Sequence, residues 1–287
     1  MKKILNLKMV LVASFLVAPL FSFGQFKFLV RPFFSYFKDK SRWEIGANYI
    51  QSNGNFEGVV PFYGFNNFYT HDETIKRDIK ADNGYGGFFG VQVPVAATGH
   101  ISVWAISIRG MFNYMNWSDL NKAYNLDGTF KDMPNQMSMT TKQFAVPIGI
   151  DWKIGSDAIA SRRLKMGLDL GAGIYPHMNV SSIDTAHVSF PPQSNFGLYP
   201  YFNADLSFFA KVCFKVRAMY TWGNCELINS SNTTYNYGLA PFTDGPFKVT
   251  SHNHLMVSLV IMPFSYKWRE FNWATDYDTY NWNEKIN

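Results

Sequence analysis

The sequence predicts an all-β protein, a transmembrane antiparallel up-and-down β-barrel of eight strands. Apolar and aromatic residues alternate with small or polar residues in eight separate segments, which is the period of a strand with two different faces. The connections between these segments are alternately long and short. Aromatic residues make up 18% of the chain and charged residues 16%, where soluble domains have roughly 25% charged residues.

The alternation defines each candidate strand in turn. In the best example, Leu168 and Leu170 share one face and Asp169 lies on the other. Each segment is long enough for the roughly 9–11 residues that a tilted barrel strand needs to cross a bilayer. We therefore predict strands at 42–51, 85–95, 101–114, 142–152, 163–175, 196–208, 212–223 and 250–264.

The connections indicate an orientation in the membrane. In order, they cover residues 52–84, 96–98, 116–137, 153–161, 177–194, 209–211 and 224–248. Alternating long and short connections are typical of outer-membrane barrels, which have long outer loops and short periplasmic turns. An even strand number then places both termini in the periplasm. Two alternatives remain: a secreted soluble β-domain, and a ten-stranded barrel in which residues 56–64 form another strand.

Composition excludes two other classes of protein. The mean hydropathy is −0.12, and beyond residue 24 no stretch approaches the ~18 consecutive apolar residues of a membrane-spanning helix. Such an aromatic-rich chain is also unlike a disordered protein, which lacks aromatic residues.

The N-terminus has the pattern of a secretory signal. Lys2, Lys3 and Lys8 precede an apolar run that ends in Ser22-Phe23-Gly24, so we predict cleavage after Gly24. Cleavage would lower the formal charge from +5 to +2, which leaves no concentrated basic face for nucleic acid. The predicted organisation is a signal peptide (1–24), a periplasmic segment (25–41), the outer-membrane barrel with four long outer loops (42–264) and an aromatic periplasmic tail (265–287).

Prolines in the strands carry a family resemblance. Pro147 lies in the run Phe144-Ala145-Val146-Pro147-Ile148 within a strand that follows a long connection, although proline is normally confined to strand edges, ends or bulges. This run, and the Ser-Phe-Gly-Gln end of the signal, resemble small outer-membrane β-barrels of the PorT-like type from Bacteroidota. The resemblance implies an eight-stranded outer-membrane barrel and, for some members, a link to protein secretion and gliding machinery. The chain departs from such barrels by continuing from Phe264 to Asn287 instead of ending on an aromatic strand residue.

Charged residues occupy the inward face of several predicted strands. A barrel of eight strands is just wide enough to be filled by side chains, and buried charges must be paired. We therefore expect a structural ion network in the lumen; the functional alternative is a path for protons or small ions. Its members would be Glu44, Arg109, Asp151, Arg163, Lys165, Asp169, Asp205, Lys215 and Arg217.

No motif for catalysis or metal binding is complete. His252 and His254 would share one face of the last strand, but a metal site needs a third ligand, which only folding could bring from residues 71–73. Along one strand, His254 and Ser258 are roughly 13 Å apart, too far for a nucleophile–base pair. The sequence thus predicts no metal site, no cofactor and no enzyme activity.

The two cysteines lie near opposite ends of the strand predicted at 212–223. About twelve extended residues separate Cys213 from Cys225, a span of roughly 40 Å, against a limit of about 7 Å between the Cα atoms of a disulfide. We predict two unpaired thiols.

Loops and tail are the predicted contact surfaces. The long connections are rich in Asn, Tyr, Ser and Gly, a composition that suits adaptable recognition. The C-terminal tail offers aromatic residues that should lie on the membrane interface or dock on a partner: Trp268, Trp273, Tyr277 and Trp282.

Together, these features predict a non-enzymatic outer-membrane barrel that is a binding, structural or assembly component. The resemblance extends this to a protein secretion apparatus. The expected partners are outer-membrane lipid and a protein bound through the outer loops or the tail, with no nucleic acid. A passive pore and a lipid-modifying enzyme are the alternatives.

Overall fold

The computed structural model describes residues 42–63, 69–97, 101–117, 122–124, 130–132, 137–158, 164–185, 191–229 and 247–265. The predicted signal peptide, the periplasmic segment and all of the aromatic tail beyond Ser265 lie outside these ranges.

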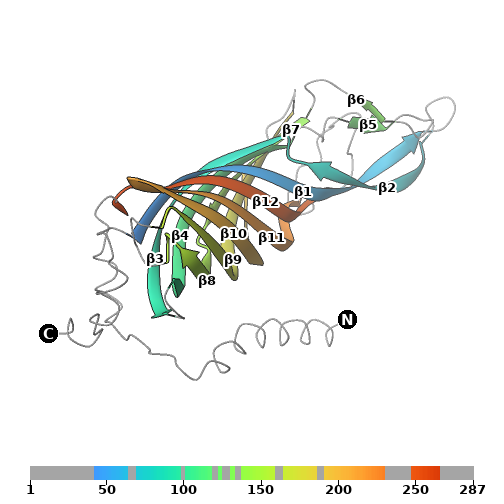
Figure 1. The fold of residues 1–287 in the computed structure, drawn as a ribbon. Coiled ribbons are helices and arrows are strands. Elements are labelled where there is room, and N and C mark those ends of the chain that lie inside the picture. The colour runs from blue at the N-terminus through green and yellow to red at the C-terminus, as the bar shows by residue number, and fades with distance from the viewer. Residues whose placement is uncertain are drawn as a thin grey trace, which may run out of the picture.

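The predicted eight-stranded antiparallel barrel is confirmed (Figure 1). Each strand pairs with its neighbours, and the last strand pairs with the first along Ile45–Gly58, which closes the sheet. The barrel consists of β1 (Trp43–Tyr63), β3 (Asn83–Ala97), β4 (Ser102–Trp117), β7 (Met137–Ala145) with β8 (Ile148–Gly155), β9 (Met166–Thr185), β10 (Gln193–Ala210), β11 (Val212–Asn229) and β12 (Phe247–Met262). A separate two-stranded sheet contains β5 (Lys122–Tyr124) and β6 (Phe130–Asp132).

Strands β7 and β8 are two halves of one barrel strand. Their register on β4 is continuous, because Ala145 lies opposite Met111 and Ile148 lies opposite Ile108. Pro147 lies at the interruption and has no N–H to donate to the ladder. Proline thus interrupts the hydrogen bonding of this strand without shifting its register.

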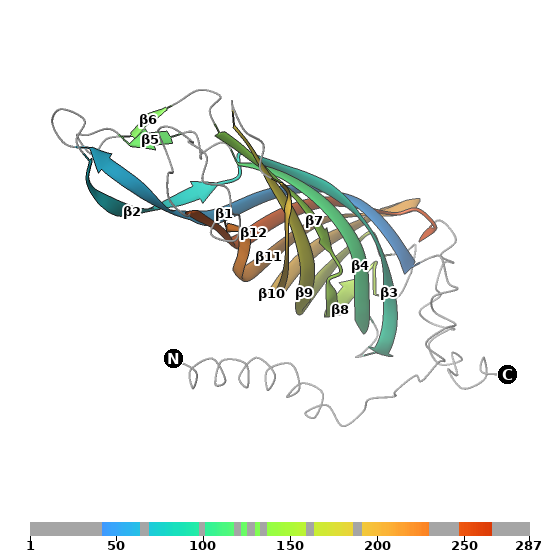
Figure 2. The same ribbon diagram turned by 180° about the vertical axis from the view of Figure 1, so that it is seen from behind.

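The prediction of a loop at residues 52–84 is wrong. β1 continues to Tyr63 and pairs with β2 (Tyr69–Lys80), so a long β-hairpin projects beyond the barrel (Figures 1 and 2). Residues 56–63 are therefore the outer half of β1, and no ten-stranded barrel forms. The outward residues of this half, such as Asn53 and Glu57, are polar; strands that leave the membrane lose the apolar face that identified them.

Other strands are longer than predicted for the same reason. The expected connection at 177–194 is largely strand, since β9 and β10 pair as far as Ser181 and Gln193. β9 has 20 residues and β10 has 18, against the 9–11 that suffice to cross a bilayer. The outward residues are apolar from Met166 to Val180 in β9 and from Phe196 to Phe208 in β10, so the loop-end part of each strand extends beyond the apolar band.

We call the end of the barrel that holds Trp43 and Met262 the terminal end, and the opposite end the loop end. Turns at the terminal end are tight: Lys211 alone joins β10 to β11, with φ 67°. Such a backbone conformation is unfavourable for a residue with a side chain. The long connections predicted from the sequence all belong to the loop end.

The distribution of side chains is inside-out relative to a soluble protein. Large apolar residues are exposed on the outer wall, as Leu259 (68%) and Phe202 (46%) illustrate, whereas Arg109 and Arg217 are fully buried in the lumen. An apolar outside with a polar inside is the pattern of a barrel surrounded by lipid. In the described ranges, no helix is long and apolar enough to cross a membrane.

Both cysteines are free and buried, as predicted from their spacing. Cys213 lies at the terminal end of β11, and Cys225 lies toward the loop end of the same strand.

Candidate functional site

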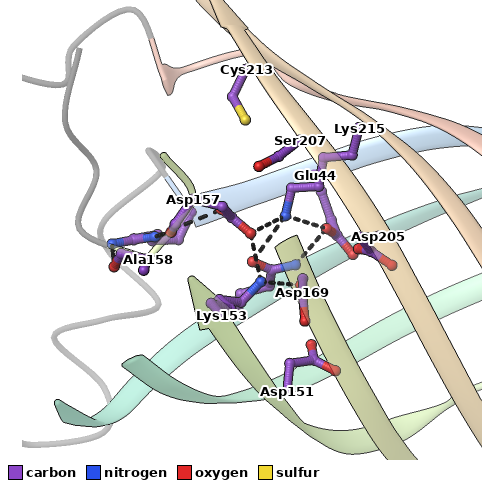
Figure 3. Close-up of polar contacts among 12 residues, drawn as sticks. Glu44, Asp151, Lys153, Asp157, Ala158, Asp169, Asp205, Ser207, Cys213 and Lys215 are labelled. Atoms are coloured by element: carbon purple, nitrogen blue, oxygen red, sulfur yellow. Dashed lines mark hydrogen bonds and ion pairs between the residues drawn. The ribbon is translucent and has the colours of Figure 1, made fainter. Parts of the chain in front are cut away.

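A network of charged side chains fills the lumen near the terminal end (Figure 3). Its centre is Glu44, on the inward face of β1. Both carboxylate oxygens accept hydrogen bonds from Arg217, at 3.0 Å each. Arg109 Nε donates to Oε1 at 2.6 Å and Gln92 Nε2 donates to Oε2 at 2.7 Å, while Lys215 Nζ lies 3.7 Å away. One carboxylate thus joins β1, β3, β4 and β11.

Arg217 links this centre to the opposite wall. Its guanidinium Nε donates to both oxygens of Asp205, at 2.9 Å each, and Nη2 donates to Oδ2 at 2.7 Å. The two residues lie directly opposite each other on β10 and β11. The planar guanidinium can bind two carboxylates along different edges, so Arg217 connects Asp205 with Glu44.

Arg109 makes the corresponding link toward β8. Its Nη2 donates to Asp151 Oδ2 at 3.0 Å. Space for the Asp151 carboxylate depends on Gly171 of β9, because a Cβ added there would lie 2.0 Å from Asp151 Oδ1. The inward glycine of one strand therefore makes room for the charged side chain of the next.

A second cluster closes the terminal end around Asp157, in the turn after β8. Lys153 Nζ donates to Asp157 Oδ2 at 2.6 Å and also to Asp169, while Lys215 Nζ donates to Asp157 Oδ2 at 2.5 Å. Arg42 Nη1 donates to the Asp157 carbonyl at 2.5 Å. Burial by itself would raise the pKa of the Asp157 carboxyl, but the ammonium groups of Lys153 and Lys215 hold that pKa well below its usual range.

The positive and negative charges in this network balance. The side chains are less than a tenth exposed, so an unpaired charge among them would be costly. The acids are Glu44, Asp151, Asp157, Asp169 and Asp205, and the bases are Arg42, Arg109, Lys153, Lys215 and Arg217. This ion layer spans the lumen from wall to wall.

The structure places most of the sequence-predicted residues in the ion layer, with two exceptions. Lys165 precedes β9 and is exposed, with its ammonium 5.9 Å from the centre of the Phe209 ring; it does not point into the lumen because the strand begins only at Met166. Arg163 lies outside the described residues. The predicted members inside the layer are Glu44, Arg109, Asp151, Asp169, Asp205, Lys215 and Arg217.

The sequence interpretation missed Lys153, Asp157, Gln92 and Arg42. Lys153 lies two residues after Asp151 and therefore on the same inward face. The strand predicted at 142–152 ended one residue too early to include it. Asp157 could not be found this way, because it enters the lumen from a turn whose path depends on the finished barrel.

A ring of amide and hydroxyl groups lies above the ion layer, toward the loop end. Neighbouring members are joined by side-chain hydrogen bonds of 2.8–3.1 Å. The hydrogen bond from Asn179 to the sulfur of Cys225 is longer, at 3.4 Å. This amide ring passes through Ser258, Asn48, Asn113, Gln143, Asn179 and Cys225.

Aromatic and imidazole rings form the next layer. His177 packs against Tyr199, with ring centres 4.4 Å apart, and Tyr199 stacks on His254 at 5.8 Å. His254 faces the lumen, whereas His252 is on the outer surface, where its Nδ1 lies 2.5 Å from Asn224 Oδ1. The prediction that the two histidines share one face is wrong, because β12 has one extra residue opposite β1: Ser52 pairs with His254 but Gly54 pairs with Ser251, and this bulge breaks the alternation of β12.

His254 and Ser258, which the sequence interpretation judged too far apart for a nucleophile–base pair, form no hydrogen bond with each other. Ser258 Oγ donates to Asn48 Oδ1 at 2.8 Å, and neither ring nitrogen of His254 has a hydrogen-bond partner in the described part of the chain. Within those same ranges, no three His, Cys, Asp or Glu residues are grouped so as to hold a metal ion.

Apolar side chains close the loop end of the lumen. Trp117 is fully buried and donates its indole N–H to Thr141 Oγ1 at 3.2 Å. The surrounding residues come from every part of the barrel wall. This apolar cap contains Ile50, Met115, Trp117, Met139, Ile183, Leu227, Phe247 and Val249. Among the described residues, buried side chains therefore occupy the lumen in successive layers from the ion layer to the apolar cap.

Comparisons with known proteins identify no family for this chain. No protein-family model matches the sequence, and no curated protein matches it. Among solved structures, the outer-membrane protease OmpT of Escherichia coli is similar at 8% identity and TM-score 0.37, covering 84% of this chain and 98% of its own. The outer-membrane protein OprG of Pseudomonas aeruginosa has 10% identity and TM-score 0.37 over 76% and 94%. The Yersinia pestis attachment invasion locus protein Ail has 13% identity and TM-score 0.29 over 75% and 97%.

Similarity at this level of identity assigns no activity to this chain.

Proposed function

We propose that this chain is a non-enzymatic outer-membrane barrel with a closed lumen, which binds a protein partner through the hairpin of β1 and β2. The observation that carries the proposal is the unbroken series of side-chain layers from the ion layer to the apolar cap. A small barrel filled in this way has no continuous water path. Its interaction with other molecules must then take place outside the lumen.

The hairpin supports this view because it is the part of the sheet that projects farthest from the barrel (Figures 1 and 2). The ladder between β1 and β12 ends at Gly58 and Phe247, while β1 and β2 continue to pair as far as Tyr63 and Tyr69. A strand pair of this length has no role in closing the barrel. Exposed segments held by a rigid scaffold commonly carry recognition.

The closed lumen is tested by conductance. The purified full-length protein in a planar bilayer should carry little or no steady current. Stable open channels of large conductance would contradict the proposal and support a passive pore.

The role of the hairpin is tested by shortening it. Replacing residues 59–74 with Asn-Gly joins Gly58 to Ile75, which are paired in the hairpin, through a favourable two-residue turn. Because the contacts of β1 with β3 and β12 remain, the barrel should fold, and cross-linking in the native membrane should no longer recover the partner. A matched control removes residues 231–244 from the connection between β11 and β12. Loss of the partner only in the control would contradict the proposal.

Orientation and location form part of the same proposal. The barrel would lie in the bacterial outer membrane with the terminal end, and hence both chain termini, in the periplasm. The variant Lys76→Cys should react with a membrane-impermeant thiol reagent in intact cells. The variant Lys211→Cys should react with it only after the outer membrane is opened. The reverse result would overturn the orientation.

The finer proposal, supported by the resemblance of the Pro147 run, is a role in a protein secretion apparatus. A deletion strain should then retain proteins that are normally exported, while its membrane lipids stay unchanged. Altered lipids with normal export would instead support the lipid-modifying enzyme.

A further inference from the structure

An apolar groove crosses the outer wall of the barrel over β3, β4, β7 and β9. It is a shallow, open hollow with a volume of about 730 Å³. Gly87 and Gly110 lie at its floor, and Phe89, Phe112 and Phe144 stand beside them. The groove is therefore open to the surroundings of the barrel and separate from the filled lumen.

The groove exists because two outward positions lack side chains. A Cβ added at Gly110 would meet no atom closer than the Phe89 carbonyl oxygen at 3.9 Å, and one at Gly87 would meet the Gly46 carbonyl oxygen at 3.4 Å. Several inward glycines are instead crowded by neighbours, as Gly171 is. Gly110 thus leaves space that no residue of the described ranges fills.

The walls of the groove are aromatic. The rings of Phe112 and Phe144 lie 5.0 Å apart and are 45% and 48% exposed. Both residues belong to the outward apolar face that surrounds the barrel. Such a surface favours a hydrocarbon chain over water.

A cation lies next to the groove, one outward residue farther toward the loop end than its lining residue Phe144. Lys142 is exposed on the outward face of β7, two residues beyond Phe144, and lies opposite Tyr114, which lies opposite Tyr85. The two tyrosine rings are 5.3 Å apart. No carboxylate of the described residues is within ion-pair distance of Lys142.

The outward residues of the barrel wall change from apolar to polar at the level of Lys142. The next outward residue of β7 is Thr140, whose hydroxyl lies 2.9 Å from that of Ser182. Tyrosine and lysine at such a boundary are typical of a membrane interface. The groove therefore begins at the interface and runs into the apolar band.

We propose that this groove binds one anionic lipid of the leaflet at the loop end, an acylated molecule with a phosphorylated head group. An acyl chain lies over Gly110 between Phe112 and Phe144, and the phosphate accepts hydrogen bonds from the Lys142 ammonium and from the phenol of Tyr114 or Tyr85. The charge of Lys142 favours the phosphate of the lipid, and the apolar walls of the groove favour its acyl chain. The inference rests on the placement of the barrel in a membrane, and it does not depend on the closed lumen or on a protein partner.

Native mass spectrometry of the full-length barrel tests the charge requirement. Bis-phosphorylated lipid A should bind saturably with one molecule per barrel and more tightly than zwitterionic phosphatidylethanolamine. Lys142→Gln should weaken lipid A binding about fivefold, as expected for one lysine at an anionic lipid surface. Lys165→Gln, which removes an exposed lysine at the terminal end, is the control and should leave binding unchanged. Equal binding of both lipids, or no effect of Lys142→Gln, would overturn the proposal.

A second variant tests the groove itself. Gly110→Leu places an apolar side chain in the open space and should abolish the saturable site, while Ala218→Leu places the same side chain on the outward face of β11 and should not. Circular dichroism and heat-modifiable gel mobility should show that both variants fold. If sedimentation shows a wild-type dimer that Gly110→Leu dissociates, the groove binds a second copy of the chain, and the lipid assignment is wrong.

Discussion

The ion layer and the apolar cap both fill the lumen, but they do so with opposite chemistry. The ion layer joins Glu44 to three cations and has its charges in balance, whereas the cap contains residues such as Met139 and Ile183 that make no ionic contact. A layer of paired charges is stable only when every partner is present. An apolar layer depends mainly on filled volume, and it tolerates changes that conserve volume. Substitutions of equal size should therefore affect the two regions very differently.

The largest expected effect is that of Glu44→Gln. The variant keeps the size of the side chain but leaves Arg217 and Arg109 with too little negative charge in a buried layer, which should cost about 3–5 kcal/mol of unfolding free energy. Guanidinium unfolding in detergent micelles measures the change. Ile45→Val is the control, because Ile45 points outward and is half exposed. Equal stability of Glu44→Gln and wild type would indicate a hydrated ion layer.

The next expected effect is a dependence of stability on acidic pH. The pKa of Asp157 is lower in the folded protein than its usual value of 3.8, so the unfolded chain binds a proton first as the pH falls. Stability from this carboxylate is complete above that usual value and declines below it, by about 1.4 kcal/mol per pH unit for one proton. Thermal unfolding between pH 5 and pH 2.5 should show the decline.

Asp157→Asn is the matched variant for this measurement. It should be less stable than wild type at pH 5, and the difference should shrink as the pH falls. A constant difference over this range would show that Asp157 does not titrate with a lowered pKa.

A change of similar size in the apolar cap should matter less. Met139→Leu conserves volume and leaves no charge unpaired, so it should cost less than about 1.5 kcal/mol. The same unfolding measurement applies. A cost as large as that of Glu44→Gln would mean that the cap requires one particular packing, and the contrast between the two regions would disappear.

The smallest expected effect on stability is that of a substitution at Lys211, which lies outside both the ion layer and the apolar cap. Lys211→Gly removes a side chain from a residue with φ 67°, which should stabilise the protein by up to about 1 kcal/mol, since the strain of that conformation is of this order. Lys211→Ala should give no such gain. Destabilisation by Lys211→Gly would show that the lysine makes a contact that outweighs the strain.

The accuracy of the sequence prediction differed between the apolar band and the rest of the chain. Inside the band, one face meets lipid and the other meets the lumen, so alternation appears directly in residues such as Leu168 and Asp169. Beyond the band, the outward face of a strand is polar instead of apolar, and the outer half of β1 was taken for a loop. The same limit explains β9 and β10, whose outward residues toward the loop end, such as Ser182 and Ser194, are polar.

By itself, the sequence determined the eight-stranded barrel and which strand faces are inward, because alternation and connection length are local properties of the chain. It also indicated that inward charges would need partners. Only the tertiary structure decided which charges meet: Glu44 and Arg217 lie far apart in the chain and become neighbours only when β12 and β1 close the sheet. The place of Asp157, the turn that brings it beneath Lys215, and the groove at Gly110 likewise depend on several strands at once. Pairing across a closed sheet is a long-range property, and no local pattern encodes it.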